Sequence, residues 1–454
     1  MRLLTILLVV LCLLGSPVQA DSNRRTVIRD AEIENTIRAF ATPLFQSAGI
    51  APDSVRLHIL ADKSLNAFVA DGLNMYIHTA LLLKTETANQ LIGVLAHETG
   101  HIAGGHLVTL RDEVAQAQTE ALLAAALGAA AAMATGRGDV GGAIAMGGQE
   151  LAMRSLFAFT RTQEQSADQA AMRLLDATKQ SPRGMLDFFE VLGDQELLSV
   201  RQQDPYVRTH PITRDRIEFV RHHLDSAPGG ESPANPAFEA MFQRIKAKLF
   251  AFTEPAARTF ARYKEADRSV HARYARAVAF YRKADLGQAR PLIDGLIAEQ
   301  PDDPYFSELK GQMLFENGRL NEALEPYRKA VRLLPDSALL RTSLAQVLVE
   351  LDDAALQREA VGHLDAALQR EPESAFAWRL MSIIHGRSGN MGVASLAMAE
   401  FAMLTGALDE AIYHAGRAAA LLPKNTPSLV RAQDIQTSAM ALKKKMRQKD
   451  PRDR

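Results

Sequence analysis

The chain has 454 residues, which predicts two or three domains at about 100–200 residues per domain. A hydrophobic content of 47% and a charged content of 23% are ordinary for a globular protein, and a net charge of −1 argues against nucleic acid or a strongly anionic surface as partner. Aromatic residues make up only 6%, and alanine is abundant. This composition favours closely packed helices over a β-sandwich.

The N-terminal segment has the pattern of an export signal. Arg2 gives a basic start, residues 3–14 form an apolar run, and a small-residue end at Ala20 predicts a secretory signal peptide cleaved after this residue. The run is shorter than the ~20 residues that a membrane span needs, so no transmembrane span is expected in the mature chain. The only cysteine, Cys12, lies in this segment. The mature chain is therefore expected to have no disulfides and no thiolate metal ligands.

The next stretch predicts one helix and a small sheet. Residues 26–49 carry apolar side chains at helical spacing, and residues 55–60, 66–69 and 75–78 have the short apolar or alternating patterns of strands. We expect residues 75–78 to form an edge strand beside the metal motif that follows in the sequence, where an extended substrate can pair with the backbone of the strand. The alternative is an ordinary strand inside the sheet.

A metal-binding motif follows this sheet. His97 and His101 are four residues apart, so on a helix they lie about 40° apart on one face and can bind a single ion. Two neutral imidazoles with Glu98 beside them form the HExxH arrangement of zinc-assisted hydrolysis, in which the carboxylate acts as the base. The apolar residues 91–96 predict a buried helix that holds these side chains rigidly.

A third histidine is close in sequence, but its position does not fit the longer motif. The pattern HExxHxxGxxH requires histidine at position 107, where this chain has Leu107. His106 is one residue early and falls on the wrong face of the helix. We therefore leave His106 out of the predicted metal ligands.

Residues 114–153 are rich in alanine and glycine and predict two close-packed helices. The apolar run of residues 121–134 is too short to span a membrane. We expect a helical hairpin that packs on the catalytic core. The alternative is a surface that touches a membrane or an assembly partner.

A second motif, which is acidic, completes the predicted metal site. Glu164 and Asp168 are four residues apart at the start of a helix, so they share a face. A catalytic zinc needs three protein ligands and an open position, and Glu164 can be the third ligand. Asp168 is then placed to orient a ligand imidazole or to act on the reacting groups. The alternative is a pair of solvated helix acids.

A loop histidine and a linker follow. His210 precedes a proline, which favours extended backbone at the histidine and presents its side chain from a loop. Residues 226–236 are rich in proline, glycine and serine and predict a linker. The predicted catalytic domain is therefore 21–225, followed by a linker with bridging helices at 226–268.

The second half of the chain has a helical repeat. Pro301 and Pro335 are 34 residues apart, which is the tetratricopeptide period. Small and aromatic residues fall at the repeat positions between them: Gly311, Ala323, Tyr327 and Ala330. We predict about four repeats in residues 269–440, with a basic tail at 441–454. Stacked repeats form a concave face that binds other proteins, and the alternative is a purely structural solenoid.

These motifs together resemble a known family. HExxH followed by an ExxxD helix, in a Thr-Arg-x-x-Glu-x-x-Ala-Asp frame, resembles the gluzincin metallopeptidases that include the prenyl-processing and HtpX-type proteases. The resemblance implies a zincin-like α+β domain with a small sheet, followed by an α-solenoid, so the chain is mostly α. It implies one zinc ion per chain, bound by His97, His101 and Glu164. It further implies Glu98 as general base, Asp168 as proton donor, and His210 as a removable fourth ligand or an oxyanion stabiliser.

The combination of an export signal, this peptidase domain and repeats resembles periplasmic members of the family. It implies an exported zinc endopeptidase in the quality control and assembly of outer-membrane β-barrel proteins. Its substrates are then unfolded or misassembled proteins, and its repeats bind the outer-membrane assembly machinery. One alternative is a repeat-based periplasmic chaperone or scaffold in which proteolysis is secondary. Another is an exported peptidase without an assembly role.

Overall fold

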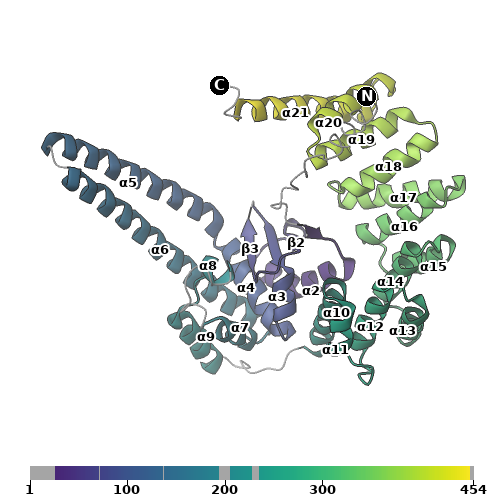
Figure 1. Cartoon of the computed structure of the whole chain (residues 1–454), viewed down its shortest axis with the longest axis horizontal. Helices are drawn as coiled ribbons and strands as arrows, with labels where there is room; N and C mark the ends of the chain where they lie inside the picture. Colours follow the sequence, from purple (N-terminus) through teal and green to yellow (C-terminus); the bar gives the residue numbers. More distant parts are fainter. Residues whose placement is uncertain (1–25, 71, 136–137, 194–204, 227–234, 450–454) are drawn as a thin grey trace, which may run out of the picture. The chain divides into compact units, whose positions relative to one another are not determined.

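The computed structural model describes residues 26–70, 72–135, 138–193, 205–226 and 235–449 (Figure 1). The predicted signal peptide, with Cys12, and residues 227–234 of the predicted linker lie outside these ranges. The chain divides into two compact units, Met1–Ile28 with Arg38–Asn235, and Arg29–Ile37 with Pro236–Arg454. Within the described ranges, no helix combines the length and apolar character needed to cross a membrane.

The first unit contains a four-stranded sheet with the order β1-β2-β4-β3. Its strands are β1 (Val27–Ile28), β2 (Arg56–Leu60), β3 (Ala67–Ala70) and β4 (Asn74–His78). β2 and β4 are parallel, whereas β1 and β3 are antiparallel to their neighbours and occupy the two edges. The prediction that residues 75–78 form an edge strand is therefore wrong. Alternation tells which side chains are buried, as Met75 and Ile77 are, but it does not tell which strands are neighbours.

The other elements between Ala31 and Ser226 are mainly helices. They are α2 (Ala31–Ser47), α3 (Thr79–Lys84), α4 (Ala88–Ala103), α5 (His106–Thr135), α6 (Gly138–Ala177), α7 (Arg183–Gly193), α8 (Pro205–Thr209) and α9 (Arg214–Ser226), with a short 3-10 turn at Pro52–Ser54. Helix α4 begins at a cap, because the Thr87 side chain accepts a hydrogen bond from the backbone N–H of Gln90. Its residues from Leu91 to Gly100 are all buried, as the apolar run predicts, and it packs against α6, α7 and β3.

Two glycines let neighbouring helices approach α4 at backbone distance. A β-carbon on Gly100 would lie 2.7 Å from the carbonyl oxygen of Ala167 on α6. A β-carbon on Gly93 would lie 2.8 Å from the backbone of Met185 on α7. Both distances are too short for a side chain, so glycine at these positions sets the spacing between the helices. The Gly100 contact places the HExxH helix directly against the ExxxD helix.

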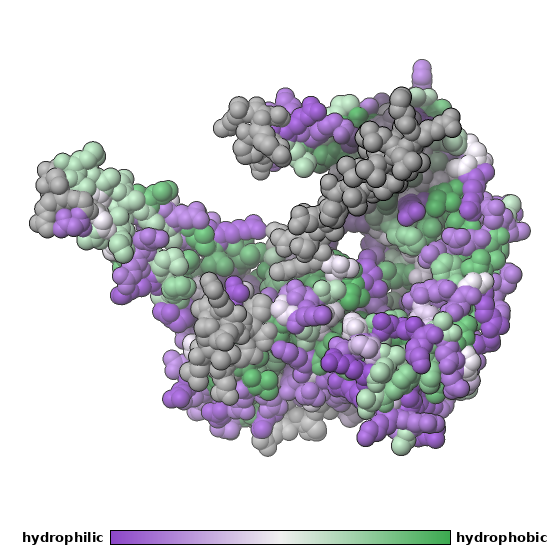
Figure 2. All heavy atoms as spheres, viewed as in Figure 1, coloured by the Kyte–Doolittle hydropathy of each residue, from purple (hydrophilic) through white to green (hydrophobic). Residues whose placement is uncertain are grey.

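Helices α5 and α6 form the predicted hairpin, running side by side beyond the rest of the first unit (Figure 1). The expectation that this hairpin packs on the catalytic core is correct only near its base. Farther out, Leu122 on α5 is 72% exposed and Met146 on α6 is 73% exposed. Hydrophobic side chains are visible along this arm in the space-filling view (Figure 2). Composition predicts that two helices pack on each other, but it does not tell what covers their outer sides.

The second unit is a series of helices. They are α10 (Pro236–Thr253), α11 (Ala256–Arg262), α12 (Val270–Arg282), α13 (Leu286–Glu299), α14 (Pro304–Glu316), α15 (Leu320–Leu333), α16 (Ala338–Glu350), α17 (Ala354–Arg370), α18 (Ala375–Arg387), α19 (Met391–Thr405), α20 (Leu408–Leu421) and α21 (Pro427–Lys449). The prediction of a mostly α chain with a small sheet and helical repeats is confirmed. From Val270 onward the described helices form five packed pairs, one more than predicted.

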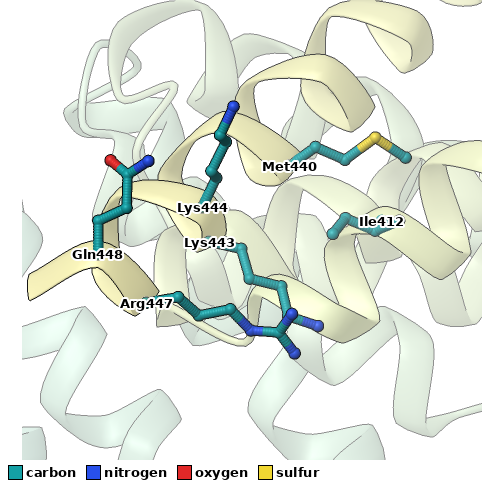
Figure 3. Close-up of a pocket in the computed structure, with 6 residues that line it drawn as sticks. All are labelled: Ile412, Met440, Lys443, Lys444, Arg447 and Gln448. Carbon is teal, nitrogen blue, oxygen red and sulfur yellow. The ribbon is translucent and has the colours of Figure 1, made fainter. Parts of the chain in front are cut away.

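The repeat positions explain the close helix pairs. A β-carbon on Gly311 would lie 2.7 Å from the Tyr327 ring, so glycine in α14 makes room for the aromatic side chain of α15. The last helix, α21, continues into the predicted basic tail. There Lys443, Lys444 and Arg447 lie beside a shallow hollow next to α20 (Figure 3).

We predict that Gly100→Ala pushes α4 away from α6. Overpacking of this kind costs about 1–3 kcal/mol, which urea unfolding of the variant would measure. Gly147→Ala is the matched control, because this glycine lies inside α6 with no atom within 4 Å of the position that a β-carbon would take, and alanine favours helix there. Equal stability of Gly100→Ala and wild type would show that the helices do not depend on this contact.

Candidate metal centre

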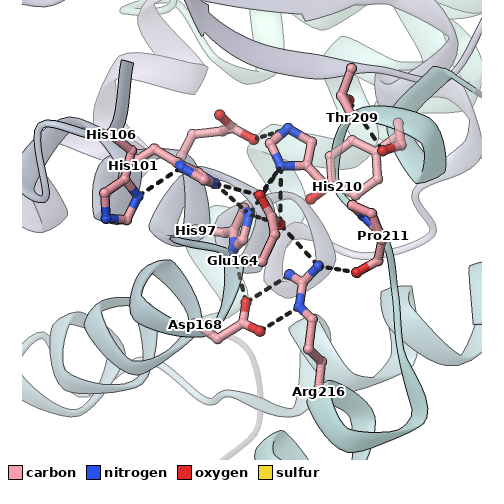
Figure 4. Close-up of polar contacts among 11 residues, drawn as sticks. His97, His101, His106, Glu164, Asp168, Thr209, His210, Pro211 and Arg216 are labelled. Carbon is pink, nitrogen blue, oxygen red and sulfur yellow. Dashed lines mark hydrogen bonds and ion pairs between the residues drawn. The ribbon is translucent and has the colours of Figure 1, made fainter. Parts of the chain in front are cut away.

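The two motifs meet at the contact between α4 and α6. His97 and His101 point from one face of α4 with their Nε2 atoms 3.0 Å apart. From α6, Glu164 places one carboxylate oxygen 3.3 Å from Nε2 of His97 and the other 3.3 Å from Nε2 of His101. The structure thus brings together the three predicted ligands, which lie around one point (Figure 4).

A fourth donor comes from the loop after α8. His210 Nδ1 lies 3.4 Å from His97 Nε2 and 3.1 Å from the nearer oxygen of Glu164. The His210 ring rests on the buried ring of Tyr206, with 4.8 Å between the centroids. Its backbone N–H donates to the Tyr206 carbonyl at 2.7 Å, which fixes the histidine relative to α8. Ligand atoms of His97, His101, Glu164 and His210 all lie within 4.8 Å of one another.

This donor set fits a zinc ion. In a tetrahedral site with zinc–ligand distances of about 2.0–2.2 Å, neighbouring ligand atoms are about 3.3–3.6 Å apart. The separations given above among the four donors are 3.0–3.4 Å, which approach this value. Imidazole nitrogens with one carboxylate are typical zinc ligands, and the part of the chain described here contributes no thiolate.

The charges of the site also suit a divalent cation. Within the described ranges, Glu98, Glu164 and Asp168 are buried together with a single compensating cation, Arg216. With the carboxylates ionised and the imidazoles neutral, as metal binding requires, two negative charges are left over, and a divalent ion would balance them. Burial by itself lowers the pKa of His97, yet the hydrogen bonds and charges of Asp168 and Glu164 raise this pKa to about 9. The site therefore attracts positive charge strongly.

His101 and Glu164 are held in the forms that bind metal. Burial lowers the pKa of His101 to about 3, so its imidazole is neutral near neutral pH. Burial alone would raise the pKa of Glu164, but the neighbouring imidazoles, His210 first, hold this pKa well below the usual value. A neutral imidazole and an ionised carboxylate are the forms required of zinc ligands.

Asp168 faces away from the ligand atoms and supports them. Its Oδ1 accepts a hydrogen bond from Nδ1 of His97 at 2.9 Å, which directs the Nε2 lone pair of this histidine at the metal position. Burial favours the protonated acid, but the charge of Arg216 lowers the pKa of Asp168 below its ordinary value. An ionised, paired carboxylate has no proton to give. Of the two roles expected for Asp168, the geometry matches orientation of His97 and not proton donation.

Arg216 connects the parts of the site, a role that was not predicted from the sequence. Its guanidinium donates to both oxygens of Asp168 at 2.6 and 2.8 Å, and lies 2.9 Å from Glu164. It also donates to the carbonyl of Pro211 at 2.6 Å. The arginine is 3% exposed. Its signal in the sequence is the Arg216-Ile217 pair five residues after the His-Pro pair, which is similar to the family but does not indicate contact with the acids.

Glu98 is the carboxylate left available for chemistry. It is 1% exposed, and among the described residues neither of its oxygens has a hydrogen-bond partner. Burial raises its pKa above the ordinary value, as expected of a group that accepts and returns protons. One oxygen lies 3.5 Å from Nε2 of His210.

His106 lies outside the four-donor cluster, as its position in the sequence indicates. Its Nδ1 lies 2.9 Å from Nδ1 of His101, on the far side of that ring from the metal position. Its ring lies over Gly104, where a β-carbon would be only 2.3 Å away. His106 therefore steadies the ring of a predicted ligand without joining the ligands.

A cavity of about 500 Å³ opens beside these residues. One wall is the edge strand β3, which contributes Phe68 and Val69. The opposite wall is the base of the hairpin, including Val108 of α5 and Thr160 of α6. Glu98 is also part of the lining, so a molecule in this cleft reaches the polar cluster.

We predict that Asp168→Asn lowers zinc affinity about 10–100-fold, because removal of an outer-shell partner of a ligand histidine typically has this effect. Competition with a chromophoric zinc chelator would measure it. Asp176→Asn is the matched control, since this aspartate lies on the same helix and pairs with His223 at the surface. An unchanged affinity in Asp168→Asn would contradict the orienting role.

Comparison with known proteins identifies both halves of the chain. Residues 28–224 match the model of peptidase family M48, and residues 274–338 match a tetratricopeptide repeat model. The beta-barrel assembly-enhancing protease of Yersinia pestis is 23% identical over 394 residues, which cover 85% of this chain and 79% of that protein. The protein of the same name from Escherichia coli K12 is 23% identical, over 85% of this chain and 78% of that protein.

The metalloprotease LoiP of Escherichia coli K12 is 24% identical over 208 residues, which cover 46% of this chain and 77% of that protein. These matches confirm the resemblance that the two motifs and the repeat period predict. The chain is therefore a metallopeptidase with an M48 peptidase domain followed by tetratricopeptide repeats.

Proposed function

We propose that this metallopeptidase is a zinc endopeptidase, with His97, His101 and Glu164 as zinc ligands and Glu98 as general base. The observation that carries the proposal is the convergence of three ligand side chains from two helices, 3.0–3.3 Å apart, beside a buried carboxylate. The domain boundaries predicted from the sequence, 21–225 and 269–440, are part of the same proposal.

Peptide-bond hydrolysis would use both the metal ion and side chains of the protein. A bound zinc ion would supply Lewis-acid activation of water and of the scissile carbonyl. Glu98 takes a proton from the attacking water and passes it to the leaving amine, a role that suits a carboxylate whose pKa is raised by burial. Asp168 and Arg216 hold His97 and Glu164 in place during these steps.

The substrate we propose is an extended polypeptide paired with β3. Asn66 accepts a hydrogen bond from the backbone of His78, and Phe68 is opposite Tyr76, so alternate residues of β3 bond to β4. The N–H and C=O groups of Ala67 and Val69 then face the open edge. An extended chain that adds to this edge lies along the cleft with its backbone held in register.

His210 is proposed to regulate this site. With His210 included, four protein donors surround the metal position, which leaves no vertex of a tetrahedron for water. This arrangement supports a resting enzyme in which His210 caps the ion and must move before cleavage. The competing role, stabilisation of the oxyanion, would require the histidine to stay near the site without binding zinc.

We further propose a periplasmic role in the quality control and assembly of outer-membrane β-barrel proteins. The names of the similar proteases support this role, and the repeats offer a surface for protein partners. Unfolded or misassembled outer-membrane proteins are the proposed substrates. A second candidate is a chaperone or scaffold in which proteolysis is secondary, and the four-donor arrangement favours it, because a capped enzyme binds without cutting.

We predict that Glu98→Gln retains zinc but loses cleavage of casein, because the amide cannot accept the proton from water. Zinc analysis and a casein assay on one preparation would test this. The same change at exposed Glu120 is the control and should cleave casein at the wild-type rate. A Glu98→Gln protein that cuts at the native rate would show that another group is the base.

The role of His210 can be tested with His210→Ala. If His210 caps the ion, the variant cleaves casein faster than wild type, because a coordination position is opened. If His210 stabilises the oxyanion, kcat falls by about 10²–10³, the typical loss for one such donor. A rate equal to that of wild type would remove His210 from the mechanism.

A further inference from the structure

One face of α6 continues outward from the active site as a row of exposed apolar side chains. Counting back from Glu164 at about 100° per residue, Thr160, Phe157, Met153 and Met146 all lie within about 40° of the direction of this carboxylate. Thr160 lines the cleft. Phe157 is 55% exposed, Met153 43% and Met146 73%. The helix face that carries a predicted zinc ligand thus also presents an apolar row, defined here as Phe157, Met153 and Met146.

The row has the chemistry of a site for apolar side chains of varied shape. Methionine is flexible and polarisable and is common at surfaces that bind many sequences, and phenylalanine offers a large apolar area. Charges lie among these side chains: Glu150 is also about 40° from the direction of Glu164 and pairs with Arg154, and Arg161 is four residues from Phe157 on the same helix. A run of exposed apolar side chains next to a cleft offers a surface to which another molecule can bind.

We infer that the apolar row is a second binding site for the polypeptide substrate, which holds apolar residues of an extended chain whose scissile bond lies at the metal centre. We choose the substrate as the bound molecule because the row is continuous with the cleft: the same helix face lines the cleft through Thr160 and Glu164. This inference rests on the peptidase reaction proposed above and adds a second contact with the substrate outside the cleft, which selects chains with apolar segments.

The geometry sets the distance between the two sites. At about 1.5 Å per residue, Phe157 lies about 10 Å along α6 from Glu164, and Met146 lies about 27 Å from it. An extended peptide covers about 3.3 Å per residue. The row should therefore contact substrate residues about three to eight positions from the scissile bond.

A peptide series tests this inference. Casein-derived peptides that share one scissile bond are extended by two to ten residues on either side, with leucine or serine at the added positions. With wild type, leucine added three to eight positions away on one side should lower KM about tenfold, whereas serine should not, and kcat should stay the same.

The Met153→Ser/Phe157→Ser double variant should lose this advantage and cleave the shortest peptide as wild type does. Leu151→Ser is the matched control, because Leu151 is 69% exposed on the same helix but points about 140° away from Glu164. The control should keep the lower KM for the long leucine peptides.

A wild-type KM of the double variant for the long leucine peptides would overturn the inference. If that variant also lost binding to phosphatidylethanolamine–phosphatidylglycerol vesicles, the row would be assigned to a lipid surface. If it instead lost self-association in sedimentation, the row would be assigned to a contact with a second copy of the chain. If wild-type enzyme cut none of the peptides, including the shortest, the proposed peptidase reaction itself would fail.

Discussion

The site depends on one close contact between two helix backbones. Gly100, one residue before His101, lies against the carbonyl of Ala167, one residue before Asp168. Because no side chain separates α4 from α6 there, Glu164 reaches both imidazoles and Asp168 reaches the back of His97. A larger residue at position 100 would separate the donors even with every ligand side chain still present. The spacing of the helices therefore matters as much as the identity of the ligands.

The buried charges of the site are arranged as a set. Three carboxylates share one arginine, and Arg216 contacts two of them, Glu164 and Asp168, while Glu98 has no such partner among the described residues. The pKa values of these carboxylates differ for separate reasons: the charge of Arg216 lowers the pKa of Asp168, the neighbouring imidazoles, His210 first, lower that of Glu164, and burial raises that of Glu98. Ligand, orienting group and base thus differ because each carboxylate has different neighbours in the same buried site.

Sequence reasoning predicted the features that depend on local spacing. Imidazoles four residues apart share a helix face, and a 34-residue period implies stacked helix pairs, so the motif helices and the repeats could be predicted. Features that depend on tertiary packing could not. Residues 75–78 alternate as an edge strand would, yet β4 lies inside the sheet because strand order is set by pairing. Arg216 has no motif spacing relative to the carboxylates that it binds, and the exposure of the hairpin depends on neighbours that composition does not specify.

The hydrogen bond from Arg216 to Pro211 has a consequence for how His210 can move. The arginine pins the chain one residue after the histidine, and the same guanidinium stays on Asp168 and Glu164. In the proposed opening, the imidazole would leave the metal position by rotation about its own side-chain bonds or by a shift of α8 and Tyr206, while Arg216 holds Pro211. The backbone on the C-terminal side of His210 would stay in place during this opening. Asp168 and Glu164 would then keep Arg216 as their counter-ion.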